Sequence, residues 1–172
     1  MAKNPGRMYR KIMQHAYTRR EYMGGVPGNR ILQFTSGQPN GDYPVTFHLI
    51  AEERAQLRHT ALESMRQTAV RSLDASLGRE NYFLQVRVYP HHVLRQNKQA
   101  SGAGADRVSM GMRLAFGKAI GTAARVEPGQ ALITIRVPLR GIAAAKESLR
   151  KCYNKVPMPC HLDMEAPADV KL

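Results

Sequence analysis

The chain has 172 residues, and its 26 Lys and Arg against 13 Asp and Glu give a formal net charge of +13. That length suits one domain that buries its own hydrophobic core, and the excess of basic charge favours a polyanionic partner such as RNA, DNA or an anionic membrane surface. No stretch approaches the roughly 18 consecutive apolar residues of a membrane-spanning helix, and the first residues lack the apolar run of a signal peptide, so we expect a cytosolic chain without a membrane partner.

Residues 1–30 are predicted to form a basic arm. They carry seven basic residues and a single acid, Glu21. Pro and Gly residues interrupt them, so one long helix is excluded and we expect the arm to fold against a partner. The alternative is a solvated, disordered tail. Tyrosines interleaved with the charges favour the first interpretation, since they can stack on bases.

Residues 31–160 are predicted to form an α+β core, a single compact domain with an antiparallel-rich sheet and two main helices. Residues 31–35 and 45–50 favour strands of a hairpin, joined by a loop rich in turn formers. Residues 51–77 show helical periodicity, and Glu52 and Glu53 would suit the positive end of that helix. We interpret this helix as scaffold.

The second half of the core follows the same logic. Residues 82–89 alternate and end before a proline, which indicates a strand. Residues 122–127 and 131–138 flank a PGQ turn and predict a second hairpin. Residues 141–153 predict the last helix, whose basic end complements the helix dipole and could also reach a phosphate. Residues 161–172 are predicted to be a short acidic tail and are not assigned to RNA.

Residues 98–112 are predicted to form a long internal loop. Three glycines and three alanines leave too little apolar side chain for a core. Lys98, Arg107 and Arg113 flank or interrupt this small-residue stretch. We interpret the segment as an extended loop that can enter a narrow anionic space; a disordered surface loop is the alternative.

Motifs that carry catalytic chemistry are nearly matched but fail in detail. The run from Gly111 to Lys118 has five residues between its glycines where a P-loop has four, and Ala119 replaces the magnesium-binding hydroxyl. Cys152 and Cys160 lack the spacing of a zinc site and are expected to be reduced thiols. The histidines show no HExxH or related spacing. The sequence therefore predicts no catalytic residue, no metal and no cofactor.

Three runs carry a resemblance to a known family. They are HVLRQNK at 92–98, SGAGADR at 101–107 and GMRLAFGK at 111–118, and the match extends through GVP at 25–27 and GTAARV at 121–126. Together they resemble the universal large-subunit ribosomal protein family called ten-e in archaea and sixteen in bacteria. The long glycine-alanine loop and the short acidic C-terminus are similar to those of an archaeal-type member.

The resemblance implies a hammerhead-like core on large-subunit rRNA, between the central protuberance and the peptidyl-transferase region. It implies that loop 98–112 points toward the acceptor ends of bound tRNAs. It also implies neighbouring large-subunit ribosomal proteins as partners and one copy per subunit, without a homo-oligomer.

We therefore expect contacts with rRNA, mainly with backbone phosphates, from nine basic residues. These are Arg7, Arg10, Arg19, Arg20, Arg30, Arg95, Arg113, Lys118 and Arg125. The residues expected to face tRNA are Lys98, Gln99, Ser101, Gly102, Ala103, Gly104, Asp106, Arg107 and Met110. A transient RNA-binding assembly factor is the alternative function, and a phosphate-handling enzyme comes third.

Overall fold

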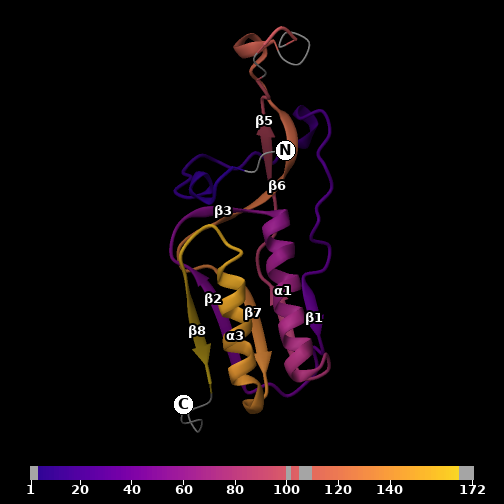
Figure 1. Cartoon of the computed structure of the whole chain (residues 1–172), viewed down its shortest axis with the longest axis vertical. Coiled ribbons are helices and arrows are strands. Elements are labelled where there is room, and N and C mark those ends of the chain that lie inside the picture. The colour runs from indigo at the N-terminus through magenta and orange to yellow at the C-terminus, as the bar shows by residue number, and fades with distance from the viewer. Residues whose placement is uncertain (1–3, 100–101, 105–109, 167–172) are drawn as a thin grey trace.

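A computed structural model describes residues 4–99, 102–104 and 110–166 of the chain, which form two antiparallel β-sheets and two α-helices (Figure 1). The strands are β1 Thr35–Gly37, β2 Val45–Ala51, β3 Ala55–Arg58, β4 Phe83–Val86, β5 His92–Gln96, β6 Lys118–Val126, β7 Ala131–Val137 and β8 Cys160–Glu165. The α-helices are α1 His59–Leu77 and α3 Ile142–Tyr153, and the 3-10 helices are η1 Gly6–Tyr9, η2 Arg20–Tyr22, η3 Gly111–Leu114 and η4 Leu139–Gly141. The predicted α+β class is confirmed.

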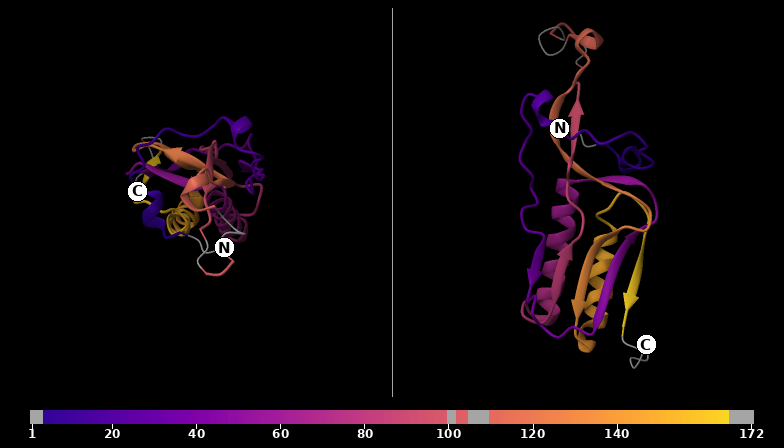
Figure 2. Two further views of the ribbon diagram at one scale, coloured as in Figure 1. Left: turned by 90° about the horizontal axis from the view of Figure 1, so that it is seen from above. Right: turned by 180° about the vertical axis from the view of Figure 1, so that it is seen from behind.

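The larger sheet has five strands in the order β1-β4-β7-β2-β8, and α1 and α3 lie against one of its faces (Figure 2). Along β2 every second side chain is fully buried, as the period of two for a half-covered strand requires. Val45 and Phe47 are completely inaccessible and belong to the same core as Leu62 and Leu73 of α1. The helices and this sheet therefore share one hydrophobic core.

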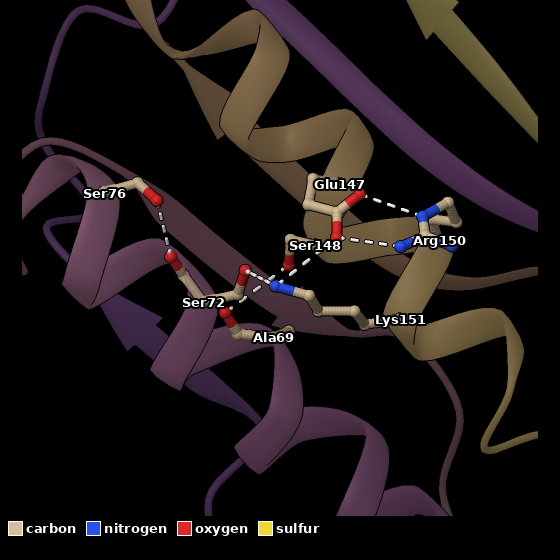
Figure 3. A network of polar contacts seen from close by, with 7 residues as sticks. All are labelled: Ala69, Ser72, Ser76, Glu147, Ser148, Arg150 and Lys151. Atoms are coloured by element: carbon tan, nitrogen blue, oxygen red, sulfur yellow. Dashed lines mark hydrogen bonds and ion pairs between the residues drawn. The ribbon is translucent and has the colours of Figure 1, made fainter.

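The two helices lie side by side and are joined by polar contacts as well as apolar ones (Figure 3). The Ser148 hydroxyl donates to the carbonyl oxygen of Ala69 at 3.4 Å, and Lys151 Nζ donates to the hydroxyl of Ser72 at 3.2 Å. Arg150, on the exposed side of α3, pairs instead with Glu147 at 2.9 Å. The basic end of α3 is therefore partly neutralised by Glu147 of α3 itself, and Lys151 also holds it to α1 through a hydrogen bond.

The smaller sheet has three strands in the order β3-β6-β5. Its strands β5 and β6 extend away from the helices as a narrow ribbon, and the described residues of the predicted loop 98–112 lie at the far end of that ribbon (Figure 1). Gly117 is needed there because a Cβ atom would lie 2.6 Å from the carbonyl carbon of Gln96. The fold thus holds the loop well away from its core.

The start of α1 differs from the prediction. The helix begins at His59, not at residue 51, because residues 55–58 pair with β6 as strand β3. Leu57 fits a helical period and an alternating one equally well, and the long-range pairing decides between them. Glu52 and Glu53 therefore lie between β2 and β3, and they do not complement the positive end of α1.

Both predicted hairpins are wrong, although most of their strands exist. Only Thr35 of the predicted strand 31–35 is in β1, which pairs with β4 and not with β2. The strands on either side of the PGQ turn, β6 and β7, belong to different sheets. The chain crosses between the sheets at that turn, where Gly129 N–H donates to the carbonyl oxygen of Ala51 at 2.8 Å. A turn signature alone does not reveal whether the flanking strands pair.

The other elements agree more closely. The predicted strand 82–89 is present in shorter form as β4, and the predicted helix 141–153 is α3, with Ala145, Leu149 and Cys152 buried. The predicted start of the acidic tail, residue 161, falls inside β8, which pairs with β2 along its full length. Residues 161–165 are therefore an edge strand of the larger sheet.

Candidate nucleic-acid interface

The described part of the basic arm, residues 4–30, is fastened to the smaller sheet. Arg10 forms an isolated β-bridge with Ala55, and Lys11 N–H donates to the carbonyl oxygen of Arg54 at 2.8 Å. Farther along, Val93 N–H donates to the carbonyl oxygen of Tyr17 at 2.9 Å. The arm therefore contributes to the fold, and its described residues run beside the smaller sheet.

Two buried histidines accept hydrogen bonds from the arm backbone. His92 Nδ1 accepts from Tyr17 N–H at 2.8 Å, and His59 Nδ1 accepts from Arg30 N–H at 2.9 Å. Burial lowers the pKa of both, and nearby arginines add to the effect; for His92 the pKa falls to about 4. Both rings are therefore neutral at physiological pH, which is the state that leaves one ring nitrogen free to accept.

Arg95 connects the arm to the ribbon. Its guanidinium carbon lies 4.5 Å from the centre of the Tyr17 ring and 4.1 Å from the centre of the Phe116 ring. These distances are typical of cation–π contacts. The same three residues line a hollow of about 310 Å³ together with Tyr22 and Met23. Tyr22 is 68% exposed, so it offers a stacking surface to a partner.

The smaller sheet also holds arginines whose Nε–H groups are buried without an acceptor among the described residues. They are Arg58 of β3, Arg95 of β5 and Arg125 of β6. Arg125 does use Nη1, which donates to the carbonyl oxygen of Gln14 at 2.9 Å. Burial lowers the pKa of Arg125, yet a guanidinium stays charged at any physiological pH. A buried donor without a partner is costly, so an incoming acceptor at these positions would be favoured.

The nine predicted rRNA-contacting residues fall into two groups. Six are exposed on the arm or at the outer end of the ribbon: Arg7, Arg19, Arg20, Arg30, Arg113 and Lys118. The other three make contacts inside the protein. Arg95 and Arg125 are half-buried as described above, and Arg10 forms an ion pair with Glu53 at 2.7 Å. The exposed group is thus the one that is free to meet phosphates directly.

The predicted tRNA-facing residues all belong to the loop at the tip of the ribbon. Ser101, Asp106 and Arg107 lie outside the described residues, and the other six are exposed: Lys98, Gln99, Gly102, Ala103, Gly104 and Met110. The base of the loop is tied by Asn97 Nδ2, which donates to the carbonyl oxygen of Gly111 at 3.3 Å. The six described residues therefore lie at the end of the ribbon that is far from the helices (Figure 1).

Some features of this surface were missed from the sequence. Met110, Met112, Leu114 and Phe116 are each more than 60% exposed, although their spacing of two looks like that of a half-buried strand. The sequence also could not predict that His59 and His92 accept hydrogen bonds from the arm, because their donors are 29 and 75 residues away in the chain. Of these features, only the exposure of the four apolar side chains could have been predicted from the sequence, because glycines and basic residues lie next to them.

The described residues offer little for catalysis. Nowhere in residues 4–99, 102–104 and 110–166 do three or more His, Cys, Asp or Glu residues come together as metal ligands would. Cys152 and Cys160 are free thiols, and burial raises the pKa of each to about 12, so neither is an activated nucleophile. None of the described helices is long and apolar enough to cross a bilayer.

Comparison with known proteins matches residues 12–163 to the family described as ribosomal protein L16p/L10e. The chain is similar to the large ribosomal subunit protein uL16 of Methanoculleus marisnigri, with 53% identity over 169 residues that cover 98% of this chain and 99% of the relative. The uL16 protein of Methanocella arvoryzae is 52% identical over 170 residues, covering 99% of each chain. That of Halobacterium salinarum is 48% identical over 168 residues, covering 96% of each.

Proposed function

The chain belongs to the ribosomal protein L16p/L10e family, in its archaeal form, and we propose that it binds large-subunit rRNA through its arm and ribbon and helps to place tRNA through the loop 98–112. Membership makes it a structural constituent of the large subunit of the cytoplasmic ribosome, and not an enzyme. The observation that carries the proposal is the arm, which holds exposed arginines beside a ribbon that projects from the core.

The exposed arginines support contacts with the RNA backbone. Arg19 and Arg20 lie in and next to η2, and Arg113 lies in η3 at the ribbon tip. Glu21 is the sole acid in the described part of the arm, so this surface is strongly positive. Guanidinium groups bind phosphates in a bidentate manner and are favoured wherever a protein recognises a nucleic-acid backbone. Such contacts set position and orientation, and not sequence preference.

The hollow around Arg95 supports a second kind of contact. Exposed Tyr17, Tyr22 and Phe116 present aromatic surface next to positive charge, which is the combination that holds unstacked RNA bases. We infer that the ribbon meets an irregular, partly single-stranded region of rRNA here. A continuous helix would hide its bases from these rings.

The loop supports a role near tRNA through its position and composition. Its described residues are small or slender and exposed, so they can approach a crowded RNA surface closely. The ribbon holds them away from the helices and the larger sheet (Figure 1). Lys98 supplies positive charge at the start of the loop.

The arm and the ribbon tip can be tested together by replacing Arg19, Arg20 and Arg113 with Ala and measuring the binding of the whole chain to large-subunit rRNA at several salt concentrations. Each lost phosphate contact should lower the salt slope by roughly 0.7–0.9. Arg150→Ala is the matched control, since Arg150 is equally basic but pairs with Glu147 on α3. An unchanged slope in the triple variant would remove the basis of the proposed rRNA contacts of the arm and the ribbon tip.

The loop can be tested by deleting residues 101–108. Subunits that carry the deletion should assemble, because the described residues of loop 98–112 belong to neither sheet. They should bind tRNA more weakly or accommodate it more slowly. Normal accommodation by assembled subunits would show that the loop does not place tRNA.

A transient assembly factor is the second candidate function. It would be released from subunits by a high-salt wash, whereas a constituent held by many phosphate contacts and a packed arm should remain at one copy per subunit. No described feature of the chain favours the transient role.

A further inference from the structure

Strand β8 forms a long free edge of the larger sheet. The two edges of that sheet are β1, with three residues, and β8, with six. The edges of the smaller sheet, β3 and β5, are both bonded by the backbone of the arm, at Lys11 and at Tyr17. Among the described residues, no segment lies along the outer side of β8 (Figure 1, Figure 2). This edge is therefore open to a partner.

The hydrogen bonds between β8 and β2 determine which backbone groups lie on the outer side of β8. Glu52 N–H donates to the carbonyl oxygen of Pro159 at 3.1 Å, and this bond continues the register of the two strands. Alternate residues of an antiparallel strand bond to the same neighbour, so three residues of β8 bond to β2. They are His161, Asp163 and Glu165. The residues between them direct both N–H and C=O outward. These are Cys160, Leu162 and Met164.

One of the outward groups is already occupied. Met164 N–H donates to Oδ1 of the neighbouring Asp163 at 2.9 Å. Charged residues on an edge strand limit its pairing with unrelated strands. The N–H groups of Cys160 and Leu162, and the carbonyl groups of all three outward residues, have no backbone partner among the described residues. The edge is thus protected in part and still offers hydrogen bonds to a strand that tolerates its charges.

The side chains of β8 alternate between two faces of the sheet. Cys160 and Met164 pack against the core, and Leu162 between them is 39% exposed. Because successive side chains of a strand point to opposite faces, the polar ones lie on the face that the helices do not cover. They are His161, Asp163 and Glu165. An added strand would therefore meet apolar side chains on one face and polar side chains on the other.

The polar face of β8 is negative. The strand has two acids and no Lys or Arg, and the side chain of Glu165 is 72% exposed. Glu52 adds a third acid beside the strand, 3.4 Å from His161, whereas Arg136 of β7 is separated from β8 by β2. The whole chain carries a net charge of +13, so this edge is opposite in sign to the chain as a whole. It repels RNA phosphates and favours a basic partner.

We propose that the outer edge of β8 binds an extended basic segment of a neighbouring protein, which adds to the larger sheet as a further strand. Its backbone pairs with the free groups of Cys160 and Leu162, as peptides do at other exposed sheet edges. Every second side chain of the segment is Lys or Arg and faces Asp163 and Glu165, since opposite charges on neighbouring strands stabilise a sheet. The side chains between them are apolar and lie beside Leu162. This interaction is independent of the proposed contacts with rRNA and tRNA.

The test titrates the blocked synthetic peptide KVKVKVK into the isotopically labelled full chain and follows the backbone amides by NMR. The proposal expects saturable shifts in β8 and slower hydrogen exchange at Cys160 and Leu162. The amides of His161 and Asp163 already bond to β2, so their exchange should change little. Absence of saturable shifts in β8, or slower exchange that ignores this alternation, overturns the proposal.

Two control peptides separate backbone pairing from charge. In KVKPKVK a proline interrupts the strand and removes one N–H, so binding should weaken at least about threefold. EVEVEVE keeps the strand-forming pattern with the opposite charge and should not bind. Equal binding of all three peptides would contradict the addition of a basic strand.

A charge reversal in the protein tests the same contact from the other side. Glu165→Lys should weaken KVKVKVK binding by roughly threefold to tenfold, because it replaces an attraction across the strands with a repulsion, and it should strengthen EVEVEVE binding. Glu80→Lys is the matched control, since Glu80 is exposed and follows α1, away from β8. An equal loss of KVKVKVK binding in both variants would show that net charge alone holds the peptide, and the proposal would fail.

Two other occupants of the edge are tested in the same samples. Single-stranded heptauridylate should leave the Leu162 amide unshifted, whereas shifts in the arm would belong to the proposed RNA contacts. Sedimentation velocity at the NMR concentration should show a monomer. Saturable shifts at Leu162 with the RNA, or a dimer in which the outward amides of β8 are protected, would overturn the proposal in favour of RNA or of a second copy of the chain.

Discussion

Replacement of His92 by Asn tests how the arm is fastened to β5. His92 is 4% exposed, and its Nδ1 atom accepts a hydrogen bond from the Tyr17 N–H at 2.8 Å. An Asn side chain places an oxygen near the position of Nδ1 but cannot take up a proton in the accessible pH range. The variant therefore keeps an acceptor for the arm and removes its titration. His92→Leu removes both.

The magnitude follows from the pKa of His92. Burial, with Arg125, His91 and Arg95 nearby, lowers this pKa to about 4 in the folded protein, whereas an unfolded chain has a value of about 6.5. Between these values the unfolded state binds a proton that the folded state does not. Stability is thus fully present above about pH 6.5 and falls as the pH drops toward 4, at about 1.4 kcal/mol per pH unit, for a total of at most about 3 kcal/mol.

Urea unfolding of the wild type and of His92→Asn at pH 7 and pH 4 measures this directly. The free energy of unfolding of the wild type should fall by at most about 3 kcal/mol more than that of the variant between the two pH values. Arg66 and Arg150 lower the pKa values of Glu63 and Glu147. Protonation of these carboxylates in acid also lowers the free energy of unfolding, but by the same amount in both proteins. Identical losses in the wild type and the variant would refute the role of His92 as a neutral acceptor.

Three further outcomes are expected. Gly117→Ala should cost about 1–3 kcal/mol of stability, because its Cβ would overlap the backbone of β5, whereas Gly28→Ala meets nothing within 4 Å; equal melting temperatures would contradict this. Cys152 and Cys160, with pKa values raised to about 12 by burial, should resist alkylation at pH 8 until the protein unfolds, as mass spectrometry of the intact chain would report. Arg95→Lys keeps the charge but loses the planar stacking between two rings, so rRNA binding should weaken by roughly 1 kcal/mol, and unchanged affinity would show that the stacking is irrelevant.

Local sequence patterns predicted the helix and the strand that bury one face in the core. The helix over residues 142–153 follows from apolar residues at helical spacing, and β2 follows from strict alternation between a core face and an open face. The family resemblance, carried by residues 92–118, supplied the functional assignment that composition alone left open among several polyanion-binding roles. Both kinds of prediction need only residues that are close in the sequence.

Pairing between distant segments could not be predicted in this way. The eight residues before α1 contain a short strand because β6, more than 60 residues later, pairs with it. The turn near Gly129 has the composition of a hairpin turn, but the strands on its two sides join different sheets. In each case a tertiary hydrogen-bonding partner overrides a local preference.

In the candidate site, too, local sequence predicted some features, and contacts between distant segments determined the others. The exposed arginines of the arm were predictable from charge clustering, but the half-buried roles of Arg95 and Arg125 depend on where Tyr17 and Gln14 cross the ribbon. Strand β3 was not predicted, because its residues were assigned to the first turns of a longer helix, and its pairing with β6 became visible only in the fold.

The most direct test of the proposed role is the amount of the protein in large ribosomal subunits after a high-salt wash, measured by quantitative mass spectrometry. A constituent anchored by its arm and ribbon should remain at close to one copy per subunit. Loss of most of the protein in the wash, or a clearly lower ratio before it, would contradict a stable structural role and favour a transient factor.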